Sequence, residues 1–388
     1  MAGWRGDLER LVPSMEAMHP DLFHGISRAW LREEVERLEA AVPRLDDDQV
    51  MVGVMRIVAS VSADGRDGHT GVFVWGTGTY PVHSLPLRVW LFPDGAYVVD
   101  ALPAYQGLVG SRIDAVAGHP IAGVLAAIDP LVPRDNAETV VLVTPRFVLI
   151  PEVLHGLGLL TRVGPVALRL TESGGRTRTV DVDPVPMSEY NEWAGPYGLH
   201  LPPGPGPLSL RRTDELEWHE RLGSSEYVQY NEVEPLSLGA LRDLRRACAR
   251  PGLERIVVDI RRNFGGETHE SAPVARILEA AHGRGVRIVV ITGRNTFSAA
   301  SLFAARLERT TDATFVGEPM GGSPNLYGNS RDLELPYSGL DVSVATSSEV
   351  GSTPGDPRLS IEPDVRVELT SADYFAGRDP VLAAALRA

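Results

Sequence analysis

IVVDIRRNFGG, residues 256–266, is the stretch that decides the fold: an apolar run that ends directly in a polar turn with two glycines. A second apolar run, VRIVVIT, follows at 286–292, and a third, ATFVGEP, at 313–319. The segments between the runs have helical periodicity, which is typical of parallel strand–helix–strand units. We therefore predict an α/β fold whose chemistry lies in the loops at the carboxyl ends of these strands.

Two of these loops carry residues suited to acyl transfer. One holds Gly265 and Gly266, and the other holds Ser298 at the start of the helical segment NTFSAASLFAARLER. N–H groups at a helix start lack intrahelical partners and favour negative charge, so an oxyanion beside Ser298 would be stabilised there. The glycines would let a second N–H approach, because no Cβ stands in the way. A serine in this position can also serve only as a helix cap.

The base that would activate Ser298 cannot be a lysine. The chain contains none, so all 37 basic residues are arginine. Arginine stays protonated at any working pH, which leaves a histidine or, less favourably, a carboxylate.

Composition narrows the class of protein. The 388 residues allow two or three domains, and 43% hydrophobic with 23% charged residues is ordinary for a soluble chain. The net charge of −14 disfavours nucleic acid and anionic membranes as partners. The single Cys248 excludes an intramolecular disulfide, and we expect it to be a packed thiol. The sequence contains no run of about 18 apolar residues, the length that would predict a membrane span, and no signal segment is evident. We therefore expect a cytoplasmic location.

The chain divides into three predicted domains. Helical periodicity over 26–42 and 46–61 indicates an N-terminal helical unit, which ends in the glycine-flanked turn DGHTGV around His69. Short strands around one helix then form a β-rich module, and a linker rich in Pro and Gly separates it from the rest. The predicted domains are residues 1–80, residues 84–184 with a helical insertion near 133–164, and residues 185–388, the catalytic domain.

A histidine base needs a carboxylate to orient its ring. His69 is accessible at its turn, although a lone histidine beside a strand is more often structural. Three acids follow the serine loop in the chain, namely Glu349, Asp356 and Glu362, and each is a surface charge by default. The residues alone leave the choice among them open.

Four motifs together carry a family resemblance. DIRRNFGG, TFSAAS, VGEPMGGSPN and IEPDV, in this order, resemble the catalytic domain of the C-terminal processing (tail-specific) serine peptidases, an S41-like family. The resemblance implies an α+β multidomain protein with a ClpP/crotonase-like βαβ core and a PDZ-like module at 84–184. It implies Ser298 as nucleophile, with an oxyanion hole formed by the N–H of Ala299 and that of Gly265 or Gly266.

The chain departs from this family at the base. Ser323 stands where the processing branch has its lysine. The resemblance predicts that Ser323 and Asn325, in the same segment, contact the substrate. The tricorn-like branch instead uses a histidine from a segment similar to DGHTGV, and His69 matches it. Asp356 lies near the position expected for the carboxylate, although the family usually has glutamate there.

The resemblance implies a serine-type endopeptidase of the tail-specific type, with His69 as base and polypeptide substrates bound in extended form or by their C-terminus. It implies no cofactor, and no HExxH or similar histidine pair predicts a metal. An inactive peptide- or lipid-binding protein on the same scaffold is the alternative, since retinoid-binding modules of the visual system have this fold. An ester hydrolase is a weaker third possibility, and nothing in the sequence sets the oligomeric state.

Overall fold

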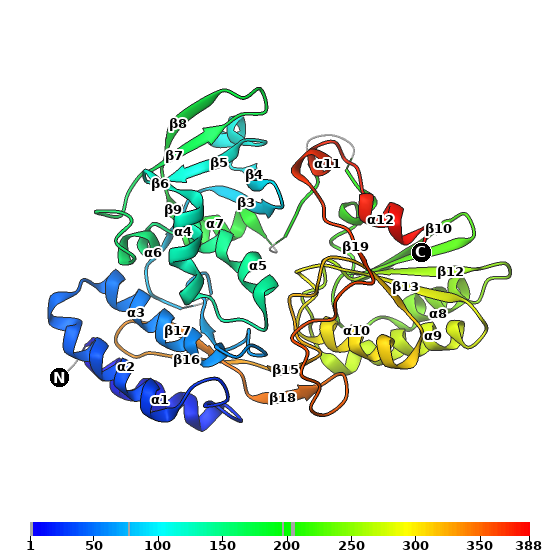
Figure 1. Ribbon diagram of the computed structural model, residues 1–388, viewed down its shortest axis with the longest axis horizontal. Helices are drawn as coiled ribbons and strands as arrows, with labels where there is room; N and C mark the ends of the chain where they lie inside the picture. Colours follow the sequence, from blue (N-terminus) through cyan, green and yellow to red (C-terminus); the bar gives the residue numbers. More distant parts are fainter. Residues whose placement is uncertain (1–2, 77, 196–197, 203–205) are drawn as a thin grey trace. The chain divides into compact units, whose positions relative to one another are not determined.

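The computed structural model describes residues 3–76, 78–195, 198–202 and 206–388. Helices and strands alternate in two compact units, which confirms the predicted mixed α/β multidomain fold (Figure 1). The first unit comprises 1–135, 139–199 and 327–348, and the second comprises 136–138, 200–326 and 349–388. None of the helices in the described residues has the length and apolar run needed to cross a membrane.

The first unit begins with three helices, of which the second and third lie within the predicted segments 26–42 and 46–61. They are α1 (Trp4–Met18), α2 (Arg28–Ala41) and α3 (Asp47–Ala59). Helix α3 starts at a capping box: the Asp46 side chain accepts from the Gln49 N–H, and the Gln49 side chain accepts from the Asp46 N–H. The periodic apolar residues of α3 are buried in the core of this unit.

The β-rich module of the first unit is an antiparallel sheet in the order β3-β4-β5-β7-β8, with β6 paired to β5. Helix α4 (Ile121–Ile128) follows β6, and the predicted insertion forms α5 (Ala137–Val148) and α6 (Pro151–Gly156). Helix α7 (Met187–Ala194) comes after the module. The strands are β3 (Leu87–Phe92), β4 (Gly95–Ala101), β5 (Arg112–Val116), β6 (His119–Pro120), β7 (Val166–Thr171) and β8 (Thr177–Val182).

A small three-stranded sheet brings a late segment into the first unit. Strand β1 (Gly71–Val72) pairs antiparallel with β17 (Asp341–Val344), which pairs with β16 (Arg331–Glu334). The hairpin over 331–344 therefore lies in the first unit, whereas the sequence assigns it to the 185–388 domain. Its apolar residues complete the core of the helical unit, which is the physical reason for the difference. Strands β2 (His83–Ser84) and β9 (Val185–Pro186) form a further pair.

The second unit is built on a six-stranded sheet in the order β10-β11-β12-β13-β14-β19. Strands β11 to β19 run parallel, while β10 pairs antiparallel with β11, so the predicted strand–helix–strand units are present. The strands are β10 (Glu217–Leu222), β11 (Ser225–Tyr230), β12 (Arg255–Asp259), β13 (Arg287–Thr292), β14 (Thr314–Gly317) and β19 (Val365–Arg366). Strands β15 (Asn325–Gly328) and β18 (Ser347–Val350) pair where the chain leaves and re-enters this unit.

Helices cover both faces of this sheet (Figure 1). Alternate strand residues such as Val258 and Val290 pack with α8 (Leu238–Cys248), α9 (Ala272–His282) and α10 (Ala299–Thr310). Their neighbours Val257 and Val289 pack with α12 (Pro380–Ala385), which follows the short α11 (Ser371–Phe375). The strands are apolar on both sides because both faces are buried, as in other parallel sheets.

Candidate active site

Ser298 occupies a strained turn between β13 and α10. Its backbone has φ 52° and ψ −128°, a conformation that residues other than glycine rarely adopt. The Ser298 side chain makes no capping hydrogen bond to α10. The residue is half-buried, and α10 begins at the next residue, Ala299. A strained serine between a strand and a helix is the arrangement in which α/β-hydrolases expose a nucleophilic hydroxyl.

Thr296 holds this turn in place. Its hydroxyl donates to the Ile260 carbonyl (2.8 Å) and accepts from the Gly293 N–H (3.2 Å). Its carbonyl accepts from the Gly322 N–H (3.0 Å) and the Ser301 hydroxyl (3.1 Å). Thr296 is fully buried, so these bonds fix the turn rigidly.

The glycine pair lies directly against the serine turn. Gly265 has φ 108°, and a Cβ placed there would lie 2.7 Å from Ser298 Cβ and 2.9 Å from the Ala299 nitrogen. Gly266 has φ 128°, and its Cβ would lie 2.3 Å from the Val233 carbonyl oxygen. Only glycine fits either position. The predicted closeness of Gly265, Ser298 and Ala299 is therefore present in the second unit.

The loop after β14 also reaches the serine turn. A Cβ on Gly322 would lie 3.1 Å from the Ser298 nitrogen, so this loop passes beside the turn. Ser323 follows it, fully buried, and its hydroxyl donates to the Leu359 carbonyl (2.9 Å). Asn325 instead binds the segment over 352–353, through its side-chain nitrogen to the Thr353 carbonyl (2.9 Å) and its oxygen to the Ser352 N–H (3.1 Å). In this structure both side chains tie the loop to later segments, and their contact with substrate stays a prediction.

Of the three acids, Asp356 is the most constrained. Its carboxylate accepts from the Arg358 guanidinium (2.8 Å) and the Ser352 hydroxyl (2.6 Å). The Arg358 hydrogen bond holds the pKa of Asp356 well below its usual range. Glu349 lies half-exposed in β18, and Glu362 is exposed. All three acids belong to the second unit, and the choice among them remains a prediction.

His69 belongs to the first unit, whereas Ser298 belongs to the second, so the pairing of the two stays a prediction. The histidine lies in a well-fixed turn: the Gly68 N–H donates to an Asp135 carboxylate oxygen (2.6 Å), and the Thr70 N–H donates to Asp67 (2.9 Å). His69 is half-buried by surface exposure, and the protein around its ring lowers its pKa by desolvation. The charge of Asp67 opposes this lowering. A neutral imidazole at physiological pH is what a general base requires.

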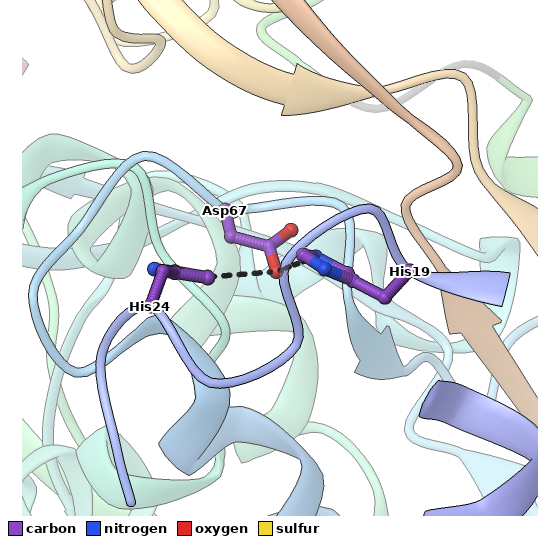
Figure 2. Close-up of side chains that lie close together, drawn as sticks. All are labelled: His19, His24 and Asp67. Carbon is purple, nitrogen blue, oxygen red and sulfur yellow. Dashed lines mark hydrogen bonds and ion pairs between the residues drawn. The ribbon is translucent and has the colours of Figure 1, made fainter. Parts of the chain in front are cut away.

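Asp67 is itself held between two histidines (Figure 2). Its Oδ2 lies 3.1 Å from His19 Nε2 and 3.6 Å from His24 Nε2, and the carboxylate is completely buried. Burial alone would raise the pKa of Asp67, but the two imidazoles outweigh it and hold that pKa well below its usual range. Burial would likewise lower the pKa of His24, yet Asp67 and Asp64 raise it. The cluster therefore fixes a charged carboxylate two residues from His69.

This His19–His24–Asp67 cluster has the residue types of a metal site, but its hydrogen bonds do not suit one. His19 Nδ1 accepts from the Asp21 N–H (3.0 Å), so in the neutral ring the proton sits on Nε2 and points to Asp67. A nitrogen that carries a proton cannot bind a metal ion. We therefore interpret the cluster as a compensated buried charge.

Sequence reasoning missed the two histidines of this cluster, which lie more than forty residues from Asp67, and gave that residue only a turn role. It also missed Asn263, whose backbone carbonyl accepts from the Phe297 N–H (3.1 Å) and so joins the glycine loop to the serine turn. The one available signal was the position of Asn263 inside RRNFGG.

Comparison with solved structures identifies the fold. The chain aligns with mature CPAF complexed with lactacystin at a TM-score of 0.63, over 99% of this chain and 97% of that one, with 13% identity. It shares the fold of CPAF. A CPAF variant with a serine replaced by alanine aligns at 0.65, with 14% identity over 97% and 94% of the two chains. The photosystem II D1 C-terminal processing protease aligns over 98% of this chain with a TM-score of only 0.43.

No model of a known protein family matches the sequence, and no curated protein matches it. At 13–14% identity the similarity to CPAF concerns the fold, so the chemistry has to be argued from the residues of this chain.

Proposed function

We propose that the protein is a serine endopeptidase of the tail-specific type with Ser298 as nucleophile. The observation that carries the proposal is the strained Ser298 turn, set at the start of α10 and against the glycine pair. Strain of this kind costs on the order of 1–3 kcal/mol and persists where function requires it. The free N-terminal end of α10 would stabilise an oxyanion at the attacked carbonyl.

In the proposed reaction His69 takes the proton of Ser298 as the hydroxyl attacks a peptide carbonyl, and later gives it to the leaving amine. Water then releases the acyl-enzyme. The lowered pKa of His69 supports this role, because the ring is neutral and ready to accept a proton. A carboxylate, for which Asp356 is our choice, would orient the imidazole. The β-rich module would bind an extended peptide at a strand edge, as PDZ domains do.

Active-site labelling with a fluorophosphonate probe, run beside hydrolysis of a casein-derived peptide mixture, tests the proposal. We expect the wild-type protein to be labelled and active, and the Ser298→Ala variant to be neither while it remains folded. Ser301→Ala is the comparison variant: it removes a buried hydroxyl that helps to hold the serine turn through the Thr296 carbonyl, so we expect lower activity but retained labelling. Labelling that survives in Ser298→Ala, or a wild-type protein that is neither labelled nor active, would contradict the proposal.

A further inference from the structure

Asn263 is a fully buried polar side chain in the glycine loop, between β12 and Gly265. Its Nδ2 donates to the Tyr230 carbonyl at the end of β11 (2.9 Å), and its Oδ1 accepts from the Gly265 N–H (2.9 Å). The amide orientation is unambiguous, because a flipped amide would set its NH₂ group against the Gly265 N–H. With the Phe297 N–H bound to its carbonyl, Asn263 connects three segments.

This arrangement decides which glycine can serve an oxyanion. The Gly265 N–H is already used by Asn263, so it is not available to a substrate. The Gly265 carbonyl accepts from the Val233 N–H (2.7 Å), and the Glu267 N–H donates to the Val233 carbonyl (2.7 Å). Because successive residues of an extended chain point their polar groups to opposite sides, the Gly266 N–H faces away from Val233.

The Gly266 N–H forms no hydrogen bond within the described residues, and neither does the Ala299 N–H at the start of α10. Ala299 is buried, where an unpaired backbone donor is rare, and Gly266 is exposed, so its N–H is accessible to a bound substrate. We propose that Asn263 is a positioning residue that, by holding the Gly265 N–H, directs the Gly266 N–H to join that of Ala299 as the donor pair of the oxyanion hole. The inference rests on the proposed peptidase function and deepens it.

Turnover of an Asn263→Ala variant tests the inference. Alanine releases the Gly265 N–H and lets the loop drift, so we expect kcat to fall about 10²- to 10³-fold, as for loss of one oxyanion donor, with KM changed less than about threefold. Affinity for a peptide aldehyde, which forms a tetrahedral adduct with the serine, should fall in parallel. Affinity for the corresponding peptide alcohol, which forms no adduct, should stay unchanged.

Asn231→Ala is the matched control. Asn231 lies in the same unit and also bridges backbone segments, with Nδ2 donating to the Arg212 (3.0 Å) and Glu215 (2.8 Å) carbonyls. Both variants should lower the thermal midpoint, and only Asn263→Ala should lower kcat. Equal losses of kcat in the two variants would show a merely structural role and overturn the inference.

Asn263→Leu covers the case in which the alanine variant does not fold, because leucine fills nearly the same volume as asparagine. Leucine removes the acceptor for the Gly265 N–H, so kcat should again fall at least about 100-fold. A folded Asn263→Leu variant with near wild-type kcat would refute the inference alone. A wild-type protein that neither cleaves peptides nor binds the aldehyde would instead refute the proposed function, and the inference with it.

Discussion

Replacing Gly265 by alanine should inactivate the protein far more than it destabilises it. The new Cβ would lie 2.7 Å from Ser298 Cβ, 2.9 Å from the Ala299 nitrogen and 3.0 Å from the Phe297 carbonyl oxygen. All of these atoms belong to the rigid serine turn, so either this turn or the glycine loop must move. Displacing one oxyanion donor costs about 2.7–4 kcal/mol of transition-state stabilisation, which is about 10²- to 10³-fold in kcat.

Stability should change through two separate effects at Gly265. The positive φ of 108° disfavours a Cβ by roughly 1–2 kcal/mol, and the forced contacts add about 1–3 kcal/mol. Gly252→Ala isolates the first effect, because Gly252 has φ 73° and an added Cβ would meet nothing within 4 Å. We expect the control to lose stability, measured by denaturant unfolding, but to keep its kcat. If Gly265→Ala turned over substrate within a few-fold of Gly252→Ala, the placement of the glycine loop against Ser298 would be refuted.

Three further predictions concern the proton, the acid and the strain. Because burial lowers the pKa of His69, the acid limb of the kcat/KM profile should lie below pH 6.5. Asp67→Asn should shift this limb to still lower pH, because it removes a charge that raises the pKa of His69. An acid limb above pH 6.5 would exclude His69 as base. If Asp356 orients the base, Asp356→Asn should lower kcat on the order of 10⁴-fold. Glu349→Gln and Glu362→Gln should then stay near the wild-type kcat. If one of these glutamine variants is folded but inactive, that glutamate has the orienting role. Ser298→Gly should abolish labelling and raise the free energy of unfolding by up to about 1 kcal/mol, after the entropy cost of glycine is subtracted. A free energy of unfolding below that of the wild type would show that the turn is not strained.

The sequence predicts the second unit well because its signals are local. Each buried parallel strand is a short apolar run, and the loop residues that follow β12 and β13 meet at one sheet edge by topology alone. Gly265, Ser298 and Ala299 could therefore be placed together before any coordinates. The cap of α3 is equally local, since Asp46 and Gln49 are three residues apart.

What the sequence does not predict depends on contacts between distant segments. After the turn at His69 only Gly71 and Val72 pair in a strand, and Trp75 packs on Phe147 (4.9 Å between ring centroids). The pairing of Gly71 with Ser343, far along the chain, moves a hairpin into the first unit. The two hydrogen bonds of the Asn263 side chain are likewise set by the fold, so the residue type alone cannot reveal them.

The strain at Ser298 also bears on the choice between an enzyme and an inactive binding protein. A scaffold that only binds would gain stability from glycine at φ 52°, since glycine adopts positive φ without steric cost. The residue at this position is nevertheless a serine, and the buried hydroxyl of Thr296 stabilises the turn through its hydrogen bonds. The serine also gives α10 no capping bond in return. The strain of a residue with a Cβ at this position of the turn therefore supports the proposed peptidase over the inactive scaffold.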